Sequence, residues 1–526
     1  MKRASAAIVA VAGAFCIWSV PAAAQRPKLI VFIAVDQMRA DYLERFATQY
    51  TGGFARLNRG AAEFTNAYQD HAITETAPGH SVMLSGRFPA HTNIVTNGRG
   101  VADPNAPLVG GGGAGASPIR FRGTELFDWL QTKDSRARAL AVSRKDRGAI
   151  LPIGRAKQSV FWYASDGRFT TSTYYADTLP AWVTRFNARR IPQSYAGKVW
   201  TLLLPASAYS EPDSVVYENG GRDLVFPHAF PATPDAAAKD FASYPAMDSV
   251  TAQLALDGVR AMNLGRGPQT DLLSVSFSTT DAVGHAYGPD SREIHDQLLR
   301  LDRYLGAFID SLYKLRDSST IAFALTADHG VQPNPELRAE REHMRAQRAS
   351  VNPIISATRA TLNAAGADTG VLRFEEGLVM LNRRSLARTK LNADSILRSL
   401  ADSLRKVDGV ARVDFVNSLS ARDTIHDVVA RRWVHAIPSD FAADLVVSLA
   451  PYAYYTGGSG ATHGTPNDLD AHVPVVFYGP WFKPGKYGAP ALVADIAPTL
   501  AAIAGATPAE KLDGRPRTEA IRSARR

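Results

Sequence analysis

The chain has 526 residues, of which 45% are hydrophobic and 21% are charged. This composition excludes a disordered or collagen-like protein, and the length leaves room for several domains or for one large domain with insertions. The formal net charge of +9 is spread along the chain without a basic block, so we expect anionic small molecules rather than a nucleic acid as partners.

The first segment, residues 1–24, has the pattern of a secretory signal peptide. A basic start is followed by an apolar run from Ala4 to Val20 and by small residues that a signal peptidase accepts. We predict cleavage after Ala24 and a periplasmic or secreted location in a bacterium, with an uncleaved membrane anchor as the alternative. The only cysteine, Cys16, lies in this segment, so the mature chain would have no disulfide and no thiolate metal ligand.

Apolar runs alternate with amphipathic segments along the rest of the chain. Runs typical of strands buried on both faces cover residues 28–36, 137–143, 271–277, 319–328, 444–451 and 473–479. Helical periodicity covers residues 41–50, 248–262, 292–315, 392–406 and 495–504. The alternation predicts a doubly wound α/β fold, with a mostly parallel central sheet flanked by helices.

Two regions interrupt this alternation and are expected to be insertions. Residues 164–245 are rich in Tyr, Ser, Thr and Pro, and residues 335–440 have a helix-and-strand pattern of their own. We therefore expect one α/β domain over residues 25–526, with a core of about residues 27–163, 246–334 and 441–526.

Aspartate and histidine side chains recur in loops at the predicted strand ends, where open α/β sheets bind ligands. Each of them alone is more typical of a helix cap or a structural contact, but together they provide carboxylate and imidazole ligands without thiolate. That set suits Zn²⁺ or a mixed Zn²⁺/Mg²⁺ pair, and six ligands suffice for two ions with open positions. The six residues are Asp36, Asp281, His285, Asp328, His329 and His463.

The adjacent pair Asp328-His329 requires a particular backbone geometry to bind one ion. Neighbouring side chains on an extended strand point to opposite faces. If both reach the same ion, the strand should end at about Ala327, and Gly330 would permit the turn. The alternative is that the pair only caps a strand.

The segment ITETAPGHSVMLSG, residues 73–86, contains a candidate nucleophile. Thr76 precedes Pro78, which suits the first turn of a helix, where the positive helix end stabilises anions. A metal bound to Thr76 would lower the pKa of its hydroxyl group. The alternative is that Thr76 is an ordinary N-cap.

The order of these motifs resembles the alkaline phosphatase superfamily, and most closely its phosphate-irrepressible, PafA-type bacterial phosphatases with a threonine nucleophile. The motifs TAPGHS, TADHG and HGTPND contribute most to the resemblance, which extends from Asp36 to His463. It implies two zinc ions, one held by Asp281, His285 and His463, the other by Asp36, Asp328, His329 and Thr76. It also implies that Asn97, Lys145 and Arg147 bind the phosphate oxygens.

The resemblance implies a secreted, monomeric, zinc-dependent phosphatase that hydrolyses phosphate monoesters through a covalent phosphothreonine. Lys145 and Arg147 favour monoesters, because a monoester carries more negative charge and exposes more free oxygens than a diester. The alternatives are a phosphodiesterase or nucleotide pyrophosphatase of the same superfamily, and a non-catalytic module that binds metal or phosphate.

Overall fold

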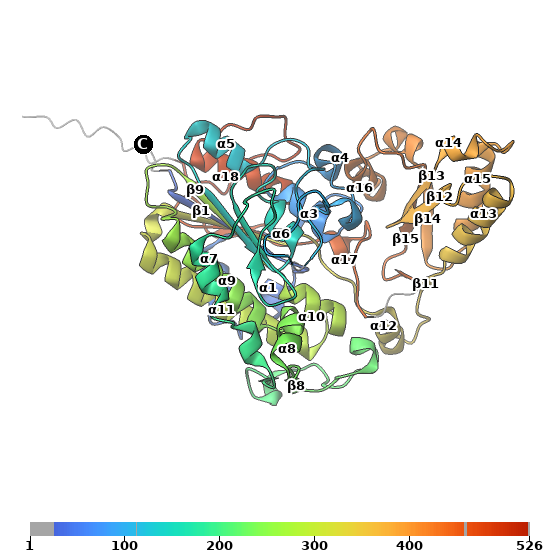
Figure 1. Cartoon of the computed structure of the whole chain (residues 1–526). Helices are drawn as coiled ribbons and strands as arrows, with labels where there is room; N and C mark the ends of the chain where they lie inside the picture. The colour runs from blue at the N-terminus through green and yellow to red at the C-terminus, as the bar shows by residue number, and fades with distance from the viewer. Residues whose placement is uncertain (1–25, 112, 457–459, 524–526) are drawn as a thin grey trace, which may run out of the picture.

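The centre of the fold is a nine-stranded sheet in the order β18-β2-β17-β10-β1-β9-β4-β5-β6 (Figure 1). The computed structural model describes residues 26–111, 113–456 and 460–523, so the predicted signal peptide lies outside the described residues. The strands of this sheet are β1 Leu29–Val35, β2 Ala62–Phe64, β4 Ala139–Ser143, β5 Ser159–Tyr163, β6 Phe169–Thr170, β9 Asp271–Phe277, β10 Ile321–Thr326, β17 Val475–Tyr478 and β18 Gly485–Tyr487.

The four central strands, β10, β1, β9 and β4, are parallel neighbours. Every residue of β1, β9 and β10 is buried, as expected for strands covered on both faces. At one side, β17 runs antiparallel to both of its neighbours, β10 and β2, so the sheet is mixed but mostly parallel. The predicted α/β fold class is confirmed, and the carboxyl ends of three central strands lie side by side.

Helices cover both faces of the sheet, with α5 (Leu126–Lys133) and α18 (Ile496–Ala504) on one face and α9 (Ala246–Ala261) and α11 (Arg292–Leu315) on the other (Figure 1). The predicted helix over residues 292–315 is confirmed in full.

The helix predicted over residues 41–50 is wrong beyond its first turn. The observed helix, α1, covers only Tyr42–Arg45. The Tyr50 hydroxyl donates to the Tyr42 carbonyl at 2.8 Å, and Phe46 stacks on His295 with 4.0 Å between ring centroids. These tertiary contacts outweigh the weak preference of so short a segment for a helix.

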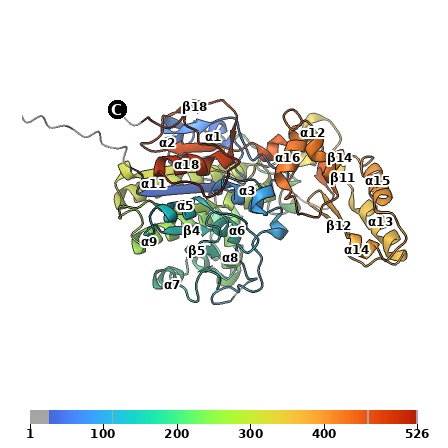
Figure 2. The same cartoon turned by 90° about the horizontal axis from the view of Figure 1, so that it is seen from above.

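A second, four-stranded antiparallel sheet lies beside the body of the protein, which is the central sheet with its covering helices. The second sheet is seen at the right of Figures 1 and 2. The strand order is β12-β13-β15-β14, and two helices pack on the sheet. The strand predicted over residues 444–451 forms β15, but it pairs with β13 and β14 instead of joining the central sheet. The elements are β12 Leu372–Glu375, β13 Leu378–Leu381, β14 Val410–Phe415, β15 Leu445–Leu449, α13 Asn352–Ala364 and α15 Ala393–Leu404.

The first predicted insertion, residues 164–245, is rich in Tyr, Ser, Thr and Pro. It forms short elements, including α7 (Ala181–Asn187) and α8 (Pro234–Asp240). A buried carboxylate of α11 anchors this region, because Asp296 accepts hydrogen bonds of 2.7 Å from the Trp200 indole and 2.6 Å from the Leu203 amide.

Within the described part of the chain, no helix is both long and apolar enough to cross a membrane.

One buried carboxylate ties helix α16 (Val428–Ala436) to the body of the protein. Asp70 lies 2.9 Å from Arg431 Nε and 3.2 Å from His435 Nδ1. Burial alone would raise the pKa of Asp70, but the hydrogen bonds from His435 and Arg431 lower it below its ordinary value. This ion pair therefore links α16 to the segment that precedes Thr76.

We expect Asp70→Asn to lower the free energy of unfolding at pH 7 by about 1–3 kcal/mol, because the variant loses a charge-assisted contact with partly exposed Arg431. A carboxyl group whose pKa is depressed by folding contributes stability above its unfolded pKa. That contribution is lost as the pH falls through the folded pKa. The difference in the free energy of unfolding between wild type and variant, measured by urea denaturation, should therefore become smaller below about pH 4.

The control is Asp368→Asn, which removes the same charge from an exposed pair with Arg388. This variant should be nearly as stable as the wild type at every pH. A gap for Asp70→Asn that stays constant down to pH 2 would contradict the assignment of a depressed pKa.

Candidate active site

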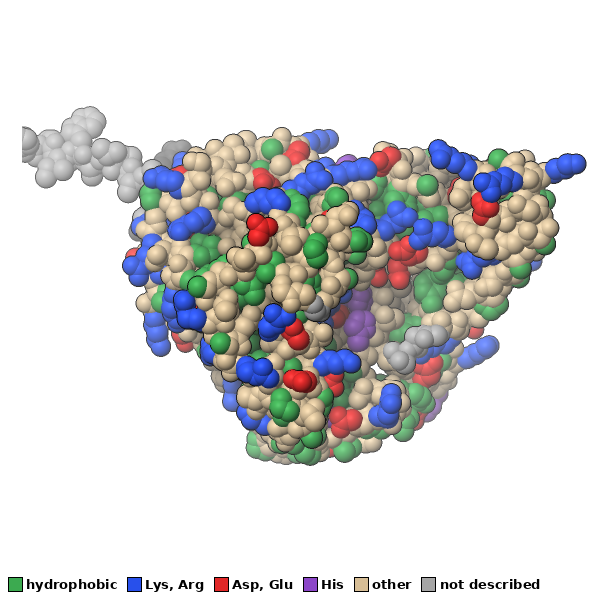
Figure 3. All heavy atoms as spheres, in the orientation of Figure 1, with side chains coloured by type: hydrophobic (Ala, Val, Ile, Leu, Met, Phe, Trp, Pro, Cys, Tyr) green, Lys and Arg blue, Asp and Glu red, His purple; other side chains and the backbone are tan. Residues whose placement is uncertain are grey.

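Six predicted side chains form two groups beside the carboxyl ends of β10, β1 and β9. Each group offers three ligand atoms that lie within 4.8 Å of one another. Their edge of the sheet opens into a hollow, where histidine side chains are visible between the body and the second sheet (Figure 3). The first group is Asp36, Asp328 and His329, and the second is Asp281, His285 and His463.

The first group is fully buried, and its inward atoms lack partners. Asp36 follows β1 directly, whereas Asp328 and His329 follow β10, which ends at Thr326 as the geometric prediction required. Among the described residues, Asp36 Oδ1, Asp328 Oδ2 and His329 Nε2 have no hydrogen-bond partner. Buried polar atoms rarely remain unpaired, so these orphaned ligand atoms fit a metal ion.

The buried carboxylates of this group have pKa values that lie far apart. Burial and the nearby charge of Asp328 raise the pKa of Asp36 to about 6. Burial opposes ionisation of Asp328 too, but the neighbouring Asp36 and His80 side chains lower its pKa to about 2. Burial also lowers the pKa of His329, which keeps its imidazole neutral, as a metal ligand must be.

Gly330 has a different role from the predicted one. Its φ is not positive, so no left-handed turn depends on it. A Cβ atom at this position would lie 2.2 Å from the Leu469 carbonyl oxygen. Glycine is therefore required for the close approach of helix α17 (Asp468–Ala471).

The second group combines one helical turn with a distant loop. Asp281 and His285 lie four residues apart on α10 (Thr279–Tyr287), with 3.2 Å between carboxylate and imidazole. His463 Nε2 lies 3.2 Å from His285 Nε2. The Nδ1 atoms of both imidazoles contact backbone carbonyls, of Ala461 at 2.9 Å and of Thr74 at 2.8 Å. Those contacts orient the Nε2 atoms toward Asp281, as in a metal-binding histidine.

Thr76 is the first residue of α3 (Thr76–Met83) and is buried. The N-cap position is Glu75, so Thr76 is not the cap of this helix. Gly79 allows α3 to approach the end of β10, because a Cβ atom there would lie 2.2 Å from the Asp328 carbonyl oxygen. The Thr76 hydroxyl group is thereby held beside the first group.

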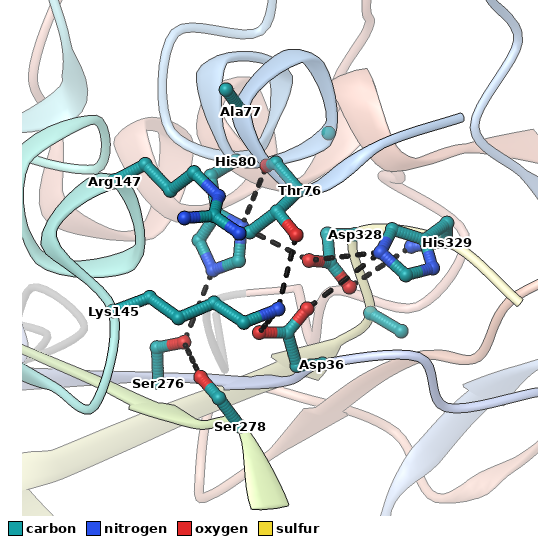
Figure 4. Close-up of polar contacts among 12 residues, drawn as sticks. Asp36, Thr76, Ala77, His80, Lys145, Arg147, Ser276, Ser278, Asp328 and His329 are labelled. Carbon is teal, nitrogen blue, oxygen red and sulfur yellow. Dashed lines mark hydrogen bonds and ion pairs between the residues drawn. The ribbon is translucent and has the colours of Figure 1, made fainter. Parts of the chain in front are cut away.

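The Lys145 ammonium group connects the two groups and the hydroxyl group (Figure 4). Its Nζ lies 2.7 Å from Asp36 Oδ2, 2.7 Å from Asp281 Oδ2 and 3.1 Å from Thr76 Oγ1. The side chain predicted to bind phosphate thus contacts the two carboxylates directly. Thr76 consequently lies where the two ligand groups meet.

Two other predicted phosphate-binding residues lie near the same point. The Asn97 side-chain oxygen accepts a bond of 2.9 Å from the Ala77 amide, which leaves the two hydrogens of its Nδ2 to donate elsewhere. Arg147 lies in α6 (Asp146–Ile150), directly after Lys145 and Asp146, and extends from the same segment as Lys145 (Figure 4).

Sequence reasoning assigned no role to His80, although it contacts three parts of the site. One ring nitrogen, Nδ1, lies 2.9 Å from the Thr76 carbonyl oxygen and 3.3 Å from Asp328 Oδ2, and the other lies 3.1 Å from Ser276 Oγ. His80 is one helical turn after Thr76 on α3, and this spacing was the only sequence signal.

Gln37 was also missed, and it bridges the two groups. Its backbone amide donates to Asp328 Oδ1 at 3.0 Å, and its side-chain amide donates to Asp281 Oδ1 at 3.2 Å. It adopts a left-handed φ of 65°, which costs free energy for a residue other than glycine. No sequence pattern signals such a conformation.

The chain matches the family described as type I phosphodiesterase / nucleotide pyrophosphatase over residues 30–466. It is 32% identical to alkaline phosphatase PhoV of Synechococcus elongatus, covering 92% of this chain and 91% of the relative. It is 30% identical to alkaline phosphatase PafA of Elizabethkingia meningoseptica, covering 95% of each chain.

The crystal structure of wild-type alkaline phosphatase PafA has a similar fold. It superposes with a TM-score of 0.87 at 29% identity, covering 95% of this chain and 100% of that chain. A further crystal structure is of a PafA variant with a threonine, an asparagine, a lysine and an arginine replaced, and its TM-score is 0.88 at 28% identity. The same four residue types meet in the present site at Thr76, Asn97, Lys145 and Arg147.

We expect His80→Ala to weaken binding of Zn²⁺ to the first group by about 10–100-fold, because Asp328 loses the imidazole that orients it. Competition with a chromophoric chelator measures this affinity. His80→Gln, which keeps a hydrogen-bonding side chain, should recover part of it.

The matched control is His91→Ala, since His91 is exposed and pairs with Asp513 away from the site. It should bind Zn²⁺ like the wild type. If His80→Ala lowers only the melting temperature and leaves the zinc affinity unchanged, His80 serves packing alone.

Proposed function

We propose that this protein hydrolyses phosphate monoesters with two zinc ions and a threonine nucleophile. The chain belongs to the type I phosphodiesterase / nucleotide pyrophosphatase family, within the alkaline phosphatase superfamily, and this membership supports the proposal together with the geometry of the site. The observation that carries the proposal is the position of Thr76. Its hydroxyl group lies 3.1 Å from an ammonium group that contacts a carboxylate of each ligand group at 2.7 Å.

The proposed zinc ligands are Asp36, Asp328, His329 and Thr76 for one ion, and Asp281, His285 and His463 for the other. Neutral imidazole and carboxylate without thiolate are the donors expected for such a pair. Zinc bound here would supply the positive charge that lowers the pKa of the Thr76 hydroxyl group and stabilises the leaving oxygen. Gln37 and His80 hold the carboxylates in position from outside.

In the proposed reaction, Thr76 Oγ1 forms a bond to phosphorus, and the bond between phosphorus and the ester oxygen breaks. The Thr76 hydroxyl group gives its proton to solvent, the leaving oxygen takes a proton from water to become an alcohol, and phosphate remains on Thr76. A water molecule then attacks phosphorus from the opposite side and loses a proton, the bond to Oγ1 breaks, Oγ1 takes up a proton, and phosphate is released. The buried start of α3 supports this role, because a helix N-terminus stabilises the charge that develops on the nucleophile.

Lys145, Arg147 and Asn97 are proposed to bind the non-bridging oxygens of phosphate. Lys145 contributes a point charge, Arg147 a fork of donors, and Asn97 the amide group that its bond to Ala77 leaves free. The names of the two relatives above, both alkaline phosphatases, agree with a monoesterase. The family description keeps a phosphodiesterase as the second candidate.

Export is part of the proposal, with residues 1–24 as signal peptide and a periplasmic or secreted mature protein that releases inorganic phosphate from organic esters. The basic start, the apolar run and the small residues of this segment support this location. We propose a monomer that binds no nucleic acid.

We expect Thr76→Ala to lower kcat for p-nitrophenyl phosphate by at least about 1,000-fold, because the bond to phosphorus can no longer form at this position. Metal analysis should still find two zinc ions per chain, since the carboxylates and imidazoles remain. The control is Thr132→Ala, which changes the same residue type on the exposed side of α5 and should leave kcat unchanged.

Two results would overturn the proposal. Full activity of Thr76→Ala would exclude the covalent mechanism. Wild-type protein that binds two zinc ions but turns over no phosphate ester would instead indicate a module that only binds metal or phosphate.

Substrate preference tests the roles of the basic pair. We expect Arg147→Ala to lower kcat/KM for phenyl phosphate by about 100-fold, but that for bis-phenyl phosphate by less than about threefold, because a diester has fewer free oxygens for the fork. The control Arg155→Ala removes an exposed arginine beyond α6 and should change neither rate. A wild-type preference for the diester would favour the phosphodiesterase.

A further inference from the structure

A pocket of about 470 Å³ lies where the second sheet meets the body of the protein. Four arginines line it together with one amide and one carboxylate, and they come from segments far apart in the sequence. These residues are Arg99, Arg373, Asn382, Arg383, Arg384 and Asp444. Figure 3 shows Lys and Arg side chains gathered over helix α14 (Arg383–Leu386), which contributes two of the arginines.

The pocket shares a junction with the candidate active site. Arg373 lies opposite Met380 in the β12-β13 hairpin, and Met380 packs in one hydrophobic cluster with Ile73 and Val95. Ile73 precedes Thr76 by three residues, and Val95 precedes Asn97 by two. One face of the hairpin therefore rests on the two segments that carry the nucleophile and the phosphate-binding amide.

Glu375 at the tip of β12 joins the hairpin to the Asn97 loop. Its Oε1 accepts from the Thr96 hydroxyl group at 2.8 Å, and its Oε2 lies 3.5 Å from Arg373 Nη2. Gly98 leaves room for this contact, because a Cβ atom there would lie 2.9 Å from the same carboxylate. The Glu375 charge is thus balanced by Arg373, and Glu375 connects the pocket to Thr96, the residue before Asn97.

The pocket has an excess of positive charge. Arg383 pairs with Asp444 at 2.8 Å, the one carboxylate among the lining residues. In the described chain, no carboxylate forms an ion pair with Arg99 or Arg384, and the Arg99 guanidinium lies 4.7 Å from the centre of the Phe441 ring. Stacking on an aromatic face holds a guanidinium plane while its donors stay available.

We propose that this arginine pocket binds a second phosphate group of substrates that carry several, while another phosphate lies at Thr76; this inference rests on the proposed function. Guanidinium forks bind phosphate oxygens in pairs, which adds geometric specificity to the attraction between the charges. The volume lies within the range of about 300–1,000 Å³ that is usual for small-molecule sites. The substrate class is therefore a small, multiply phosphorylated monoester.

The test compares inositol hexakisphosphate with inositol monophosphate as substrates. Arg384→Glu should lower the ratio of their kcat/KM values about tenfold, because one attractive contact becomes repulsive. The rate on the monophosphate should stay within about twofold of the wild type, since Arg384 is exposed and lies outside the proposed catalytic machinery. Higher salt should reduce the wild-type ratio toward that of the variant.

The control is Arg388→Glu, which reverses the charge of an arginine that follows α14 closely but pairs with Asp368 and does not line the pocket. It should leave the ratio unchanged. Equal effects of Arg384→Glu on both substrates, or an equal effect of the control, would overturn the proposal. A variant that alters only inhibition by inorganic phosphate would also overturn it, because the pocket would then hold free phosphate.

A binding measurement distinguishes a failure of this inference from a failure of the proposed function. Calorimetry of Thr76→Ala protein with inositol hexakisphosphate should show about tenfold weaker binding when Arg384→Glu is added. If the wild type hydrolyses no monoester but this loss of affinity is found, the proposed function fails and the pocket stands. If affinity is unchanged, the pocket assignment fails whatever the activity.

Discussion

The structure depends on the balance of negative charge buried at the ends of three parallel strands. Asp36 and Asp328 are fully buried and Asp281 is nearly so, and isolated carboxylates at such positions would cost several kcal/mol each. The order β10-β1-β9 forces them together, because parallel neighbours end at the same edge. Positive charge must therefore gather at this edge, and the Lys145 ammonium group supplies part of it. The same carboxylates and imidazoles form the two groups that could hold a metal ion.

The sequence predicted this edge well because it is encoded locally. An apolar run followed by an aspartate specifies a buried strand and the group at its end, so the three carboxylates and their approximate positions could be inferred without coordinates. His463 was harder, since it lies on a loop far along the chain, and only the resemblance to a family linked it to Asp281.

Contacts that depend on the tertiary register were not predictable. Gln37 joins the two ligand groups only because its φ is positive, and His80 reaches Asp328 only because Gly79 lets α3 approach β10. The apolar run at residues 444–451 specifies a strand but not its sheet, and it pairs with β13 and β14. Apolar content encodes burial, whereas the identity of the partner is decided by packing over the whole chain.

The second sheet contributes to the site without supplying any residue of the two ligand groups. Its hairpin fixes the Asn97 loop through Glu375 and at the same time presents Arg373 to the pocket. Contacts from Arg373 to Glu375 and from Glu375 to Thr96 thereby connect the pocket to the Asn97 loop. If the arginine pocket binds phosphate as proposed, changes in this hairpin would alter which phosphate esters bind while the ligand groups at β1, β9 and β10 stay intact. Substrate scope and metal binding would then be carried by different parts of the fold, which meet at the loop that holds Asn97.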